Sequence, residues 1–79
     1  MSESGKLVLS ALLIVGAQSK EQAEPTDRLA VRLGIGRDSL ERDLLDLQEK
    51  GYVALYEKEG MTRAYLTSTG IVTASSTYS

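Results

Sequence analysis

The feature that most constrains the fold is a row of three leucines at helical spacing. Leu40, Leu44 and Leu47 stand at positions i, i+4 and i+7, which places them on one face of an α-helix. Gly51 follows, and glycine is a typical residue just beyond the end of a helix. The pattern predicts a helix over about residues 37–50 that buries its leucine face against other elements.

Two more helices are predicted before it. Residues 27–33 follow Pro25, which marks a boundary, and they end at Gly34. Residues 5–17 are apolar around most of the helical circumference. A helix of that kind must be covered on more than one side.

A β-hairpin is predicted over about residues 52–67. Strand-forming residues occur on both sides of a polar segment whose tip is Gly60. In the first strand we expect Val53 and Leu55 to face the core. The tail, residues 71–79, shows no helical period and is predicted to be irregular or a short strand. The fold class is therefore α+β, in a single domain over residues 1–79.

The order helix, helix, turn, helix, hairpin resembles that of winged-helix transcriptional regulators of the MarR and PadR types. The resemblance rests on apolar and glycine positions at fixed offsets, and it covers about two-thirds of the chain. Those positions are Leu29, Ala30, Leu33, Gly34, Ile35, Leu40, Leu44, Leu47, Gly51, Val53, Tyr65, Leu66, Thr67 and Gly70.

The resemblance implies a small winged helix-turn-helix domain, with three helices followed by a two-stranded wing, that binds double-stranded DNA. The third helix would enter the major groove and the wing would contact the backbone. The protein would be a sequence-specific transcriptional regulator. By motif position, the implied DNA-binding residues are Arg37, Asp38, Ser39 and Arg42 on the helix and Lys58 and Arg63 on the wing.

Each of these residues also has a purely structural interpretation. Arg42 stands four residues from two aspartates, and such pairs form on solvated helix faces without a ligand. Asp38 is well placed to cap its helix. Lys58 and Arg63 flank a tip that also carries glutamates, as a solvated turn does.

The charge distribution counts against DNA binding. The chain has a formal net charge of −2, and its acidic excess lies within residues 37–50. Phosphate contacts supply most nonspecific DNA affinity, so this segment lacks the expected attraction. The alternative hypothesis is a winged-helix protein-interaction module that does not bind DNA and docks through its acidic third helix.

The composition argues against an enzyme. The chain has no histidine and no cysteine, which excludes most metal sites and His-based catalytic groups. We expect no cofactor and no metal. The longest apolar stretch is too short to cross a bilayer, so we expect a cytoplasmic protein with no membrane partner.

A homodimer is predicted through the first helix. Its apolar surface exceeds what two short helices can cover, so the remainder must meet either the tail or a second subunit. The polar tail favours the second subunit. Leu9, Leu12 and Leu13 are the residues that we expect at this interface.

Overall fold

The computed structural model describes residues 2–78, and it contains four α-helices, a short 3-10 helix and three strands within that range. The elements in chain order are α1 (Glu3–Ile14), η1 (Lys20–Gln22), β1 (Glu24–Pro25), α2 (Thr26–Leu33), α3 (Arg37–Glu49), β2 (Val53–Lys58), β3 (Met61–Leu66) and α4 (Ser68–Tyr78).

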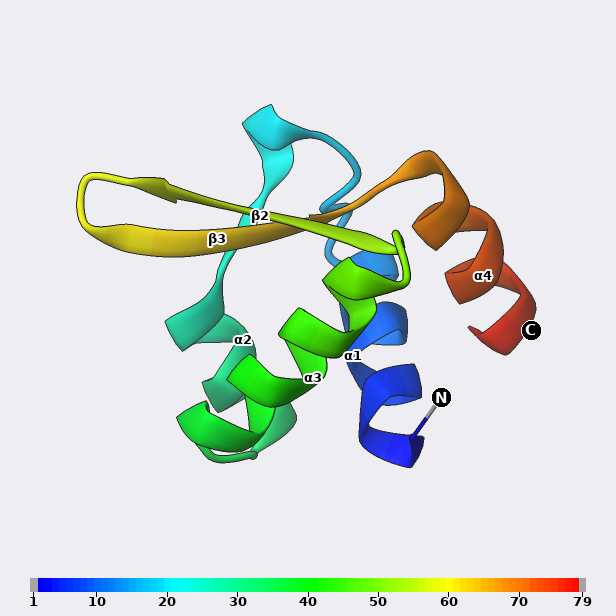
Figure 1. Cartoon of the computed structure of the whole chain (residues 1–79), viewed down its shortest axis with the longest axis horizontal. Coiled ribbons are helices and arrows are strands. Elements are labelled where there is room, and N and C mark those ends of the chain that lie inside the picture. The colour runs from blue at the N-terminus through cyan, green and yellow to red at the C-terminus, as the bar shows by residue number, and fades with distance from the viewer. Residues whose placement is uncertain (1, 79) are drawn as a thin grey trace.

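The helices α1, α2 and α3 lie together on one side of a three-stranded antiparallel sheet of order β1-β3-β2 (Figure 1). The core forms where these helices meet the sheet. Its fully buried large side chains come from every layer, and they are Val8, Leu9, Leu12, Leu29, Leu40, Leu47, Val53 and Leu66. This packing fixes α3 against the sheet by its leucine face and turns its opposite face to solvent.

The hairpin β2–β3 has a two-residue turn at Glu59–Gly60. Both residues have positive φ, 55° and 76°, which suits the right-handed twist of paired strands and which glycine adopts without penalty. Val53 is 2% exposed and Leu55 is half-buried against the core. The prediction that these two side chains face inward is confirmed.

The tail differs from the prediction of an irregular segment or short strand over residues 71–79. It is the helix α4, which packs against α1 (Figure 1). Thr67 starts it, because its Oγ1 accepts a hydrogen bond from Gly70 N at 3.0 Å and its carbonyl accepts one from Ile71 N at 2.8 Å. Among residues 68–77, whose burial the structure describes, the buried positions are the small residues Gly70 and Ala74, and Ile71 is the one large apolar side chain that packs partly buried against the core.

A second element that the sequence did not predict is β1, a two-residue strand that pairs with β3 through Glu24↔Ala64 and Pro25↔Arg63. It extends the predicted hairpin to three strands. A strand this short has no alternation from which it can be predicted, and its partner lies far along the chain. The pairing fixes the entry into α2 beside the sheet.

Candidate nucleic-acid interface

The exposed N-terminal half of α3 is the centre of the candidate site. Leu40 and Leu44 are 1% and 2% exposed, so the core holds this part of the helix rigidly from behind. The predicted contact residues on this helix are all exposed, and they are Arg37, Asp38, Ser39 and Arg42. The structure therefore places four of the six predicted site residues, all solvent-exposed, within the first six residues of α3.

The N-terminus of α3 has no side-chain cap. Gly36 occupies the N-cap position with extended backbone, φ −68° and ψ 151°, and no side chain accepts from the first amides. Asp38, for which a capping role was the structural alternative, makes no such hydrogen bond. The amides of the first turn are therefore open to solvent, and helix N-termini of this kind favour anions.

Arg37 is held by a neighbour on α2. Its guanidinium forms an ion pair with Asp27, and both side chains are largely exposed, at 72% and 58%. An ion pair in solvent is worth at most about 1 kcal/mol. Arg37 is therefore oriented beside the helix start, but it can exchange Asp27 for another anion at little cost.

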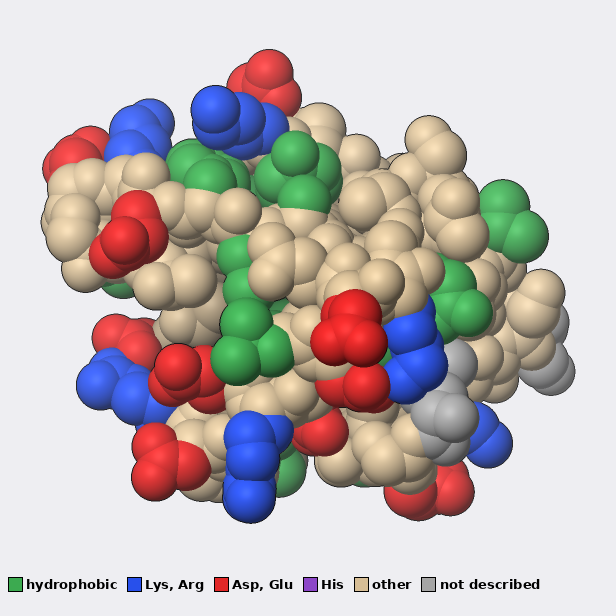
Figure 2. Space-filling model, viewed as in Figure 1, with side chains coloured by type: hydrophobic (Ala, Val, Ile, Leu, Met, Phe, Trp, Pro, Cys, Tyr) green, Lys and Arg blue, Asp and Glu red, His purple; other side chains and the backbone are tan. Residues whose placement is uncertain are grey.

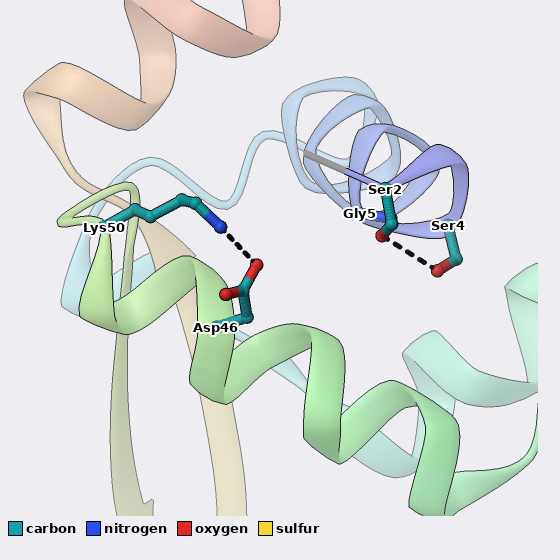
Figure 3. Close-up of polar contacts among 5 residues, drawn as sticks. All are labelled: Ser2, Ser4, Gly5, Asp46 and Lys50. Carbon is teal, nitrogen blue, oxygen red and sulfur yellow. Dashed lines mark hydrogen bonds and ion pairs between the residues drawn. The ribbon is translucent and has the colours of Figure 1, made fainter.

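Arg42 has no ion-pair partner within residues 2–78. Asp46, one of the two aspartates at helical spacing from it, pairs instead with Lys50, with 2.6 Å between Nζ and Oδ2 (Figure 3). This hydrogen bond is the main reason why the pKa of Lys50 is raised. Helix pairing therefore does not occupy Arg42, and its guanidinium is free on the exposed side of α3.

The other two predicted residues, Lys58 and Arg63, both lie on the wing but in different surroundings. Lys58 is the last residue of β2 and lies next to the turn, where it is exposed. Arg63 lies opposite Tyr56 in the middle of the sheet and is half-buried. Its Nε is enclosed without a hydrogen-bond partner among the described residues.

Alternation along the strands gives the direction of Arg63. Leu55 faces α3 and the core, so its neighbour Tyr56 and the cross-strand partner Arg63 face the opposite side of the sheet. Arg63 therefore does not lie on the α3 side, and the structure does not join it to the four residues on that helix.

A cleft of about 340 Å³ lies between the wing and α3. Figure 2 shows the surface hollowed between the hairpin tip and the helices below it. Its apolar lining comes from Leu40, Leu44, Leu45, Leu55 and Met61. Sequence reasoning did not find this cleft; the one available signal was Leu45, an apolar residue on an otherwise charged helix side, which is 51% exposed.

The residues predicted to form the dimer interface, Leu9, Leu12 and Leu13, do not lie on the exposed side of α1 where they were expected. Leu9 and Leu12 are 0% exposed within one chain, and Leu13 is half-buried against the same core. The helix α4 covers part of α1, as the tail was expected to do if no second subunit did. The exposed large apolar residues of α1 are Leu7 at 56% and Ile14 at 62%.

Two negative observations apply to the part of the chain that the structure describes. None of its helices has both the length and the apolar character needed to cross a membrane. Acidic side chains do not gather there in a group of three or more suited to holding a metal ion.

Comparison with known proteins places the fold. No protein-family model matches the sequence, and no curated protein matches it significantly. Solved structures do match. A candidate DNA-binding protein from Ralstonia eutropha JMP134 superimposes with a TM-score of 0.86 and 22% identity, over 100% of this chain and 99% of that one.

Two larger regulators are also similar. The S. aureus MepR–DNA complex gives a TM-score of 0.81 with 16% identity over 96% of this chain, which spans 60% of the MepR chain. A MarR-family transcriptional regulator from Silicibacter pomeroyi gives 0.74 with 24% identity over 92% of this chain and 49% of that one.

These similarities and the observed architecture define the class. The chain has the α+β winged helix-turn-helix fold, in which α2 and α3 form the helix-turn-helix and β2–β3 form the wing. The expected fold class is confirmed, with one more helix and one more strand than predicted. The resemblance to winged-helix regulators of the MarR type is likewise confirmed in fold.

Proposed function

We propose that this chain is a sequence-specific double-stranded DNA-binding protein that acts as a small transcriptional regulator. The third helix α3 enters the major groove and the wing contacts the phosphate backbone. The observation that carries the proposal is the exposed N-terminal half of α3. It presents Arg37 and Arg42 on a helix that the core holds rigidly, beside an uncapped helix start.

The charges along α3 are compatible with groove binding. The half that would enter the groove is neutral, because Arg37 and Arg42 balance Asp38 and Glu41. The acidic excess lies in the C-terminal half, and Lys50 offsets part of it by pairing with Asp46 (Figure 3). We therefore expect weak nonspecific attraction and a larger contribution from base contacts than from phosphates.

Arg37 is the strongest candidate for contacting a base. Exchanging its exposed ion pair with Asp27 for the edge of a guanine costs little, and a bidentate arginine contact discriminates between bases by about 1–3 kcal/mol. Lys58, at the wing tip, is suited to a phosphate. Ser39 lies in the first turn of α3, where a hydroxyl can contact either a base or a phosphate.

The active form that we propose is a homodimer. The helices α1 and α4 pack on one another, and both expose apolar side chains: Leu7, Ile14 and Val72 are 56%, 62% and 67% exposed. Leu7 and Ile14 are seven residues apart and lie on one face of α1. A two-fold dimer would double the few cations that each chain presents to DNA.

The direct test is titration of a fluorescent duplex at low salt, followed by anisotropy. We expect nonspecific binding in the range of roughly 10⁻⁴ to 10⁻⁶ M or tighter. With a selected site, Arg37→Ala should reduce the preference for that site by about 1–3 kcal/mol. Lys58→Ala should weaken all sequences alike.

The matched control is Lys6→Ala. Lys6 is an exposed cation on α1 without an ion pair in the described range, and it lies on a different helix from the candidate site. It should leave duplex binding within about twofold of the wild type. Equal losses for Arg37→Ala and Lys58→Ala on every sequence would contradict base contacts by α3.

A second candidate function is a protein-interaction module that docks through α3. The observation that favours it is Leu45, which is 51% exposed beside the cleft and is flanked by acidic residues. A leucine within a charged surface suits a basic, apolar partner. Absence of any duplex binding at low salt, with the fold intact by circular dichroism, would favour this function over the first.

A further inference from the structure

The face of the sheet that points away from α3 carries a basic and aromatic surface. The register pairs Ala54 with Tyr65, Tyr56 with Arg63 and Lys58 with Met61, and each pair alternates with a pair on the α3 side of the sheet. Met61, next to the turn, also lines the cleft between the wing and α3. These six positions contain two cations and two tyrosines but no acidic residue. We call them, together with Lys20, the outer sheet face.

Lys20 reaches this face from η1, which packs on the sheet opposite to the helices (Figure 1). The hydroxyl of Tyr56 donates to the Lys20 carbonyl at 2.8 Å. The Lys20 ammonium lies 5.1 Å from the centre of the Tyr56 ring, in a cation–π contact. Tyr65 meets Tyr56 edge-on, with 6.3 Å between ring centres, so the rings and the cation form one continuous surface.

The cations of the outer sheet face are not used in ion pairs. Lys20, Lys58 and Arg63 have no ion-pair partner within residues 2–78, whereas Arg32 of α2 and Arg37 of α3 each have one. The acidic residues that are closest in sequence to these cations lie at the edge of the outer sheet face or point to its other side. Glu21 is exposed on η1, Glu59 occupies the turn, and the register turns Glu57 toward the other face.

Figure 2 shows this edge of the molecule, where basic and hydrophobic side chains lie next to one another along the top of the hairpin, with acidic side chains at the two ends of the row. The arrangement is unexpected in a chain with a net charge of −2. Cations without an ion-pair partner attract an anion, and the tyrosine rings between them offer an apolar surface on which a planar ring can stack.

We propose that the outer sheet face binds single-stranded nucleic acid. Its phosphates would pair with Lys20, Lys58 and Arg63, and a base would stack on the tyrosine surface. Cations interleaved with aromatic rings are the common arrangement for single-strand binding, because every base has a π-face. The bases of a duplex are stacked inside it, so a half-buried tyrosine on the surface of a sheet reaches only unpaired bases.

Lys20, Tyr56 and Arg63 lie on the side of the sheet that faces away from α3, and Lys58 at the wing tip is the one residue shared with the proposed duplex contact. Lys20 and Tyr56 can therefore be substituted without altering a proposed duplex contact. The proposal therefore goes beyond the proposed function and is tested separately from it. The probe is a fluorescent oligothymidine of roughly 12 nucleotides, which is within the range that one small domain covers. A hairpin duplex of unrelated sequence is titrated in parallel.

The expected result is saturable binding of oligothymidine with a log–log salt slope of about −2, as three neutralised phosphates imply. Lys20→Gln should reduce the magnitude of that slope by about 0.7. Tyr56→Leu should weaken binding by roughly 5- to 150-fold, the range for one stacked base. Neither substitution should change the duplex affinity.

Tyr56→Phe distinguishes the stacking of a base on the ring from the structural hydrogen bond of the hydroxyl. It keeps the ring and loses only the hydrogen bond to the Lys20 carbonyl. We expect it to bind oligothymidine within about threefold of the wild type, as should Lys6→Gln on α1. Circular dichroism verifies that each variant is folded.

Several results would overturn the proposal. These are no oligothymidine binding at low salt, equal losses for Tyr56→Phe and Tyr56→Leu, or equal weakening of duplex and single strand by Lys20→Gln. Arg42→Gln on α3 distinguishes the two sites, since it should weaken the duplex and leave oligothymidine unchanged. Failure of duplex binding alone would contradict the proposed function and leave the outer sheet face supported.

Discussion

Gly70 is the position where a single methyl group should disrupt the contact between α4 and the rest of the domain. A Cβ built on Gly70 would lie 1.8 Å from the Tyr52 carbonyl oxygen and 2.8 Å from its carbon. Both are backbone atoms, so no side-chain rotation relieves the contact. Gly70→Ala therefore requires α4 or the start of the hairpin to move by more than 1 Å.

The magnitude follows from two opposing effects. Alanine is favoured over glycine in a helix by about 1 kcal/mol. Overpacking costs about 1–3 kcal/mol or more, and a rigid backbone contact belongs at the upper end. The same Tyr52 carbonyl accepts a hydrogen bond from Thr67 N at 3.0 Å, which any shift would strain. We expect a net destabilisation of about 2 kcal/mol.

Thermal unfolding followed by circular dichroism measures this effect. For a domain of this size, about 2 kcal/mol lowers Tm by roughly 8–16 °C. The matched control is Gly36→Ala, since a Cβ at Gly36 meets nothing within 4 Å and its φ is negative. A Gly70→Ala protein as stable as Gly36→Ala would refute the close packing of α4 on the hairpin.

Three further predictions concern other contacts. The hydrogen bond from Lys50 to Asp46 raises the Lys50 pKa above its ordinary 10.5, so its stabilisation is present below that pH and disappears as pH rises through the raised value. The stability difference between the wild type and Asp46→Asn should therefore shrink above about pH 10.5 in denaturant titrations. Thr67→Val removes both hydrogen bonds of a helix-capping hydroxyl and should destabilise the protein by about 1–2 kcal/mol, measured by urea unfolding. Light scattering should show a dimer for the wild type and a folded monomer for the double variant Leu7→Glu, Ile14→Glu; a monomeric wild type would contradict the proposed dimer.

The parts of the fold that the sequence predicts well are those whose large apolar residues follow a clear period. The leucine row of α3 predicts both the helix and its buried face, because leucines at i, i+4 and i+7 fall on one face of a helix and do not fit the two-residue period of a strand. The alternation of Val53 and Leu55 likewise gives the inner face of the hairpin.

The helix α4 is hidden in the sequence for the opposite reason. Its segment is rich in serine, threonine and β-branched residues, which have modest helix propensity. Its buried positions are the small residues Gly70 and Ala74, which let backbones approach closely, and Ile71 alone adds a large apolar side chain against the core. The contacts of α4 with α1 and Tyr52 are tertiary, so they leave no local pattern in the sequence.

The solvent-exposed face of α1 could not be predicted from the sequence, for a related reason. Because the helix is apolar on most sides, its pattern does not distinguish buried Leu9 from exposed Leu7. At the candidate site, the resemblance to winged-helix regulators implied the exposed residues of α3, but only the strand register could show that Arg63 faces away from them.

The central claim is that duplex DNA contacts α3 and the wing tip, and amide chemical-shift mapping tests it most directly. A ¹⁵N-labelled sample of the full chain is titrated with duplex DNA at low salt. We expect the chemical-shift changes to be concentrated at residues 36–42 and around the Glu59–Gly60 turn, with the amides of α4 unchanged. Shifts absent from residues 36–42 at saturating duplex would contradict it.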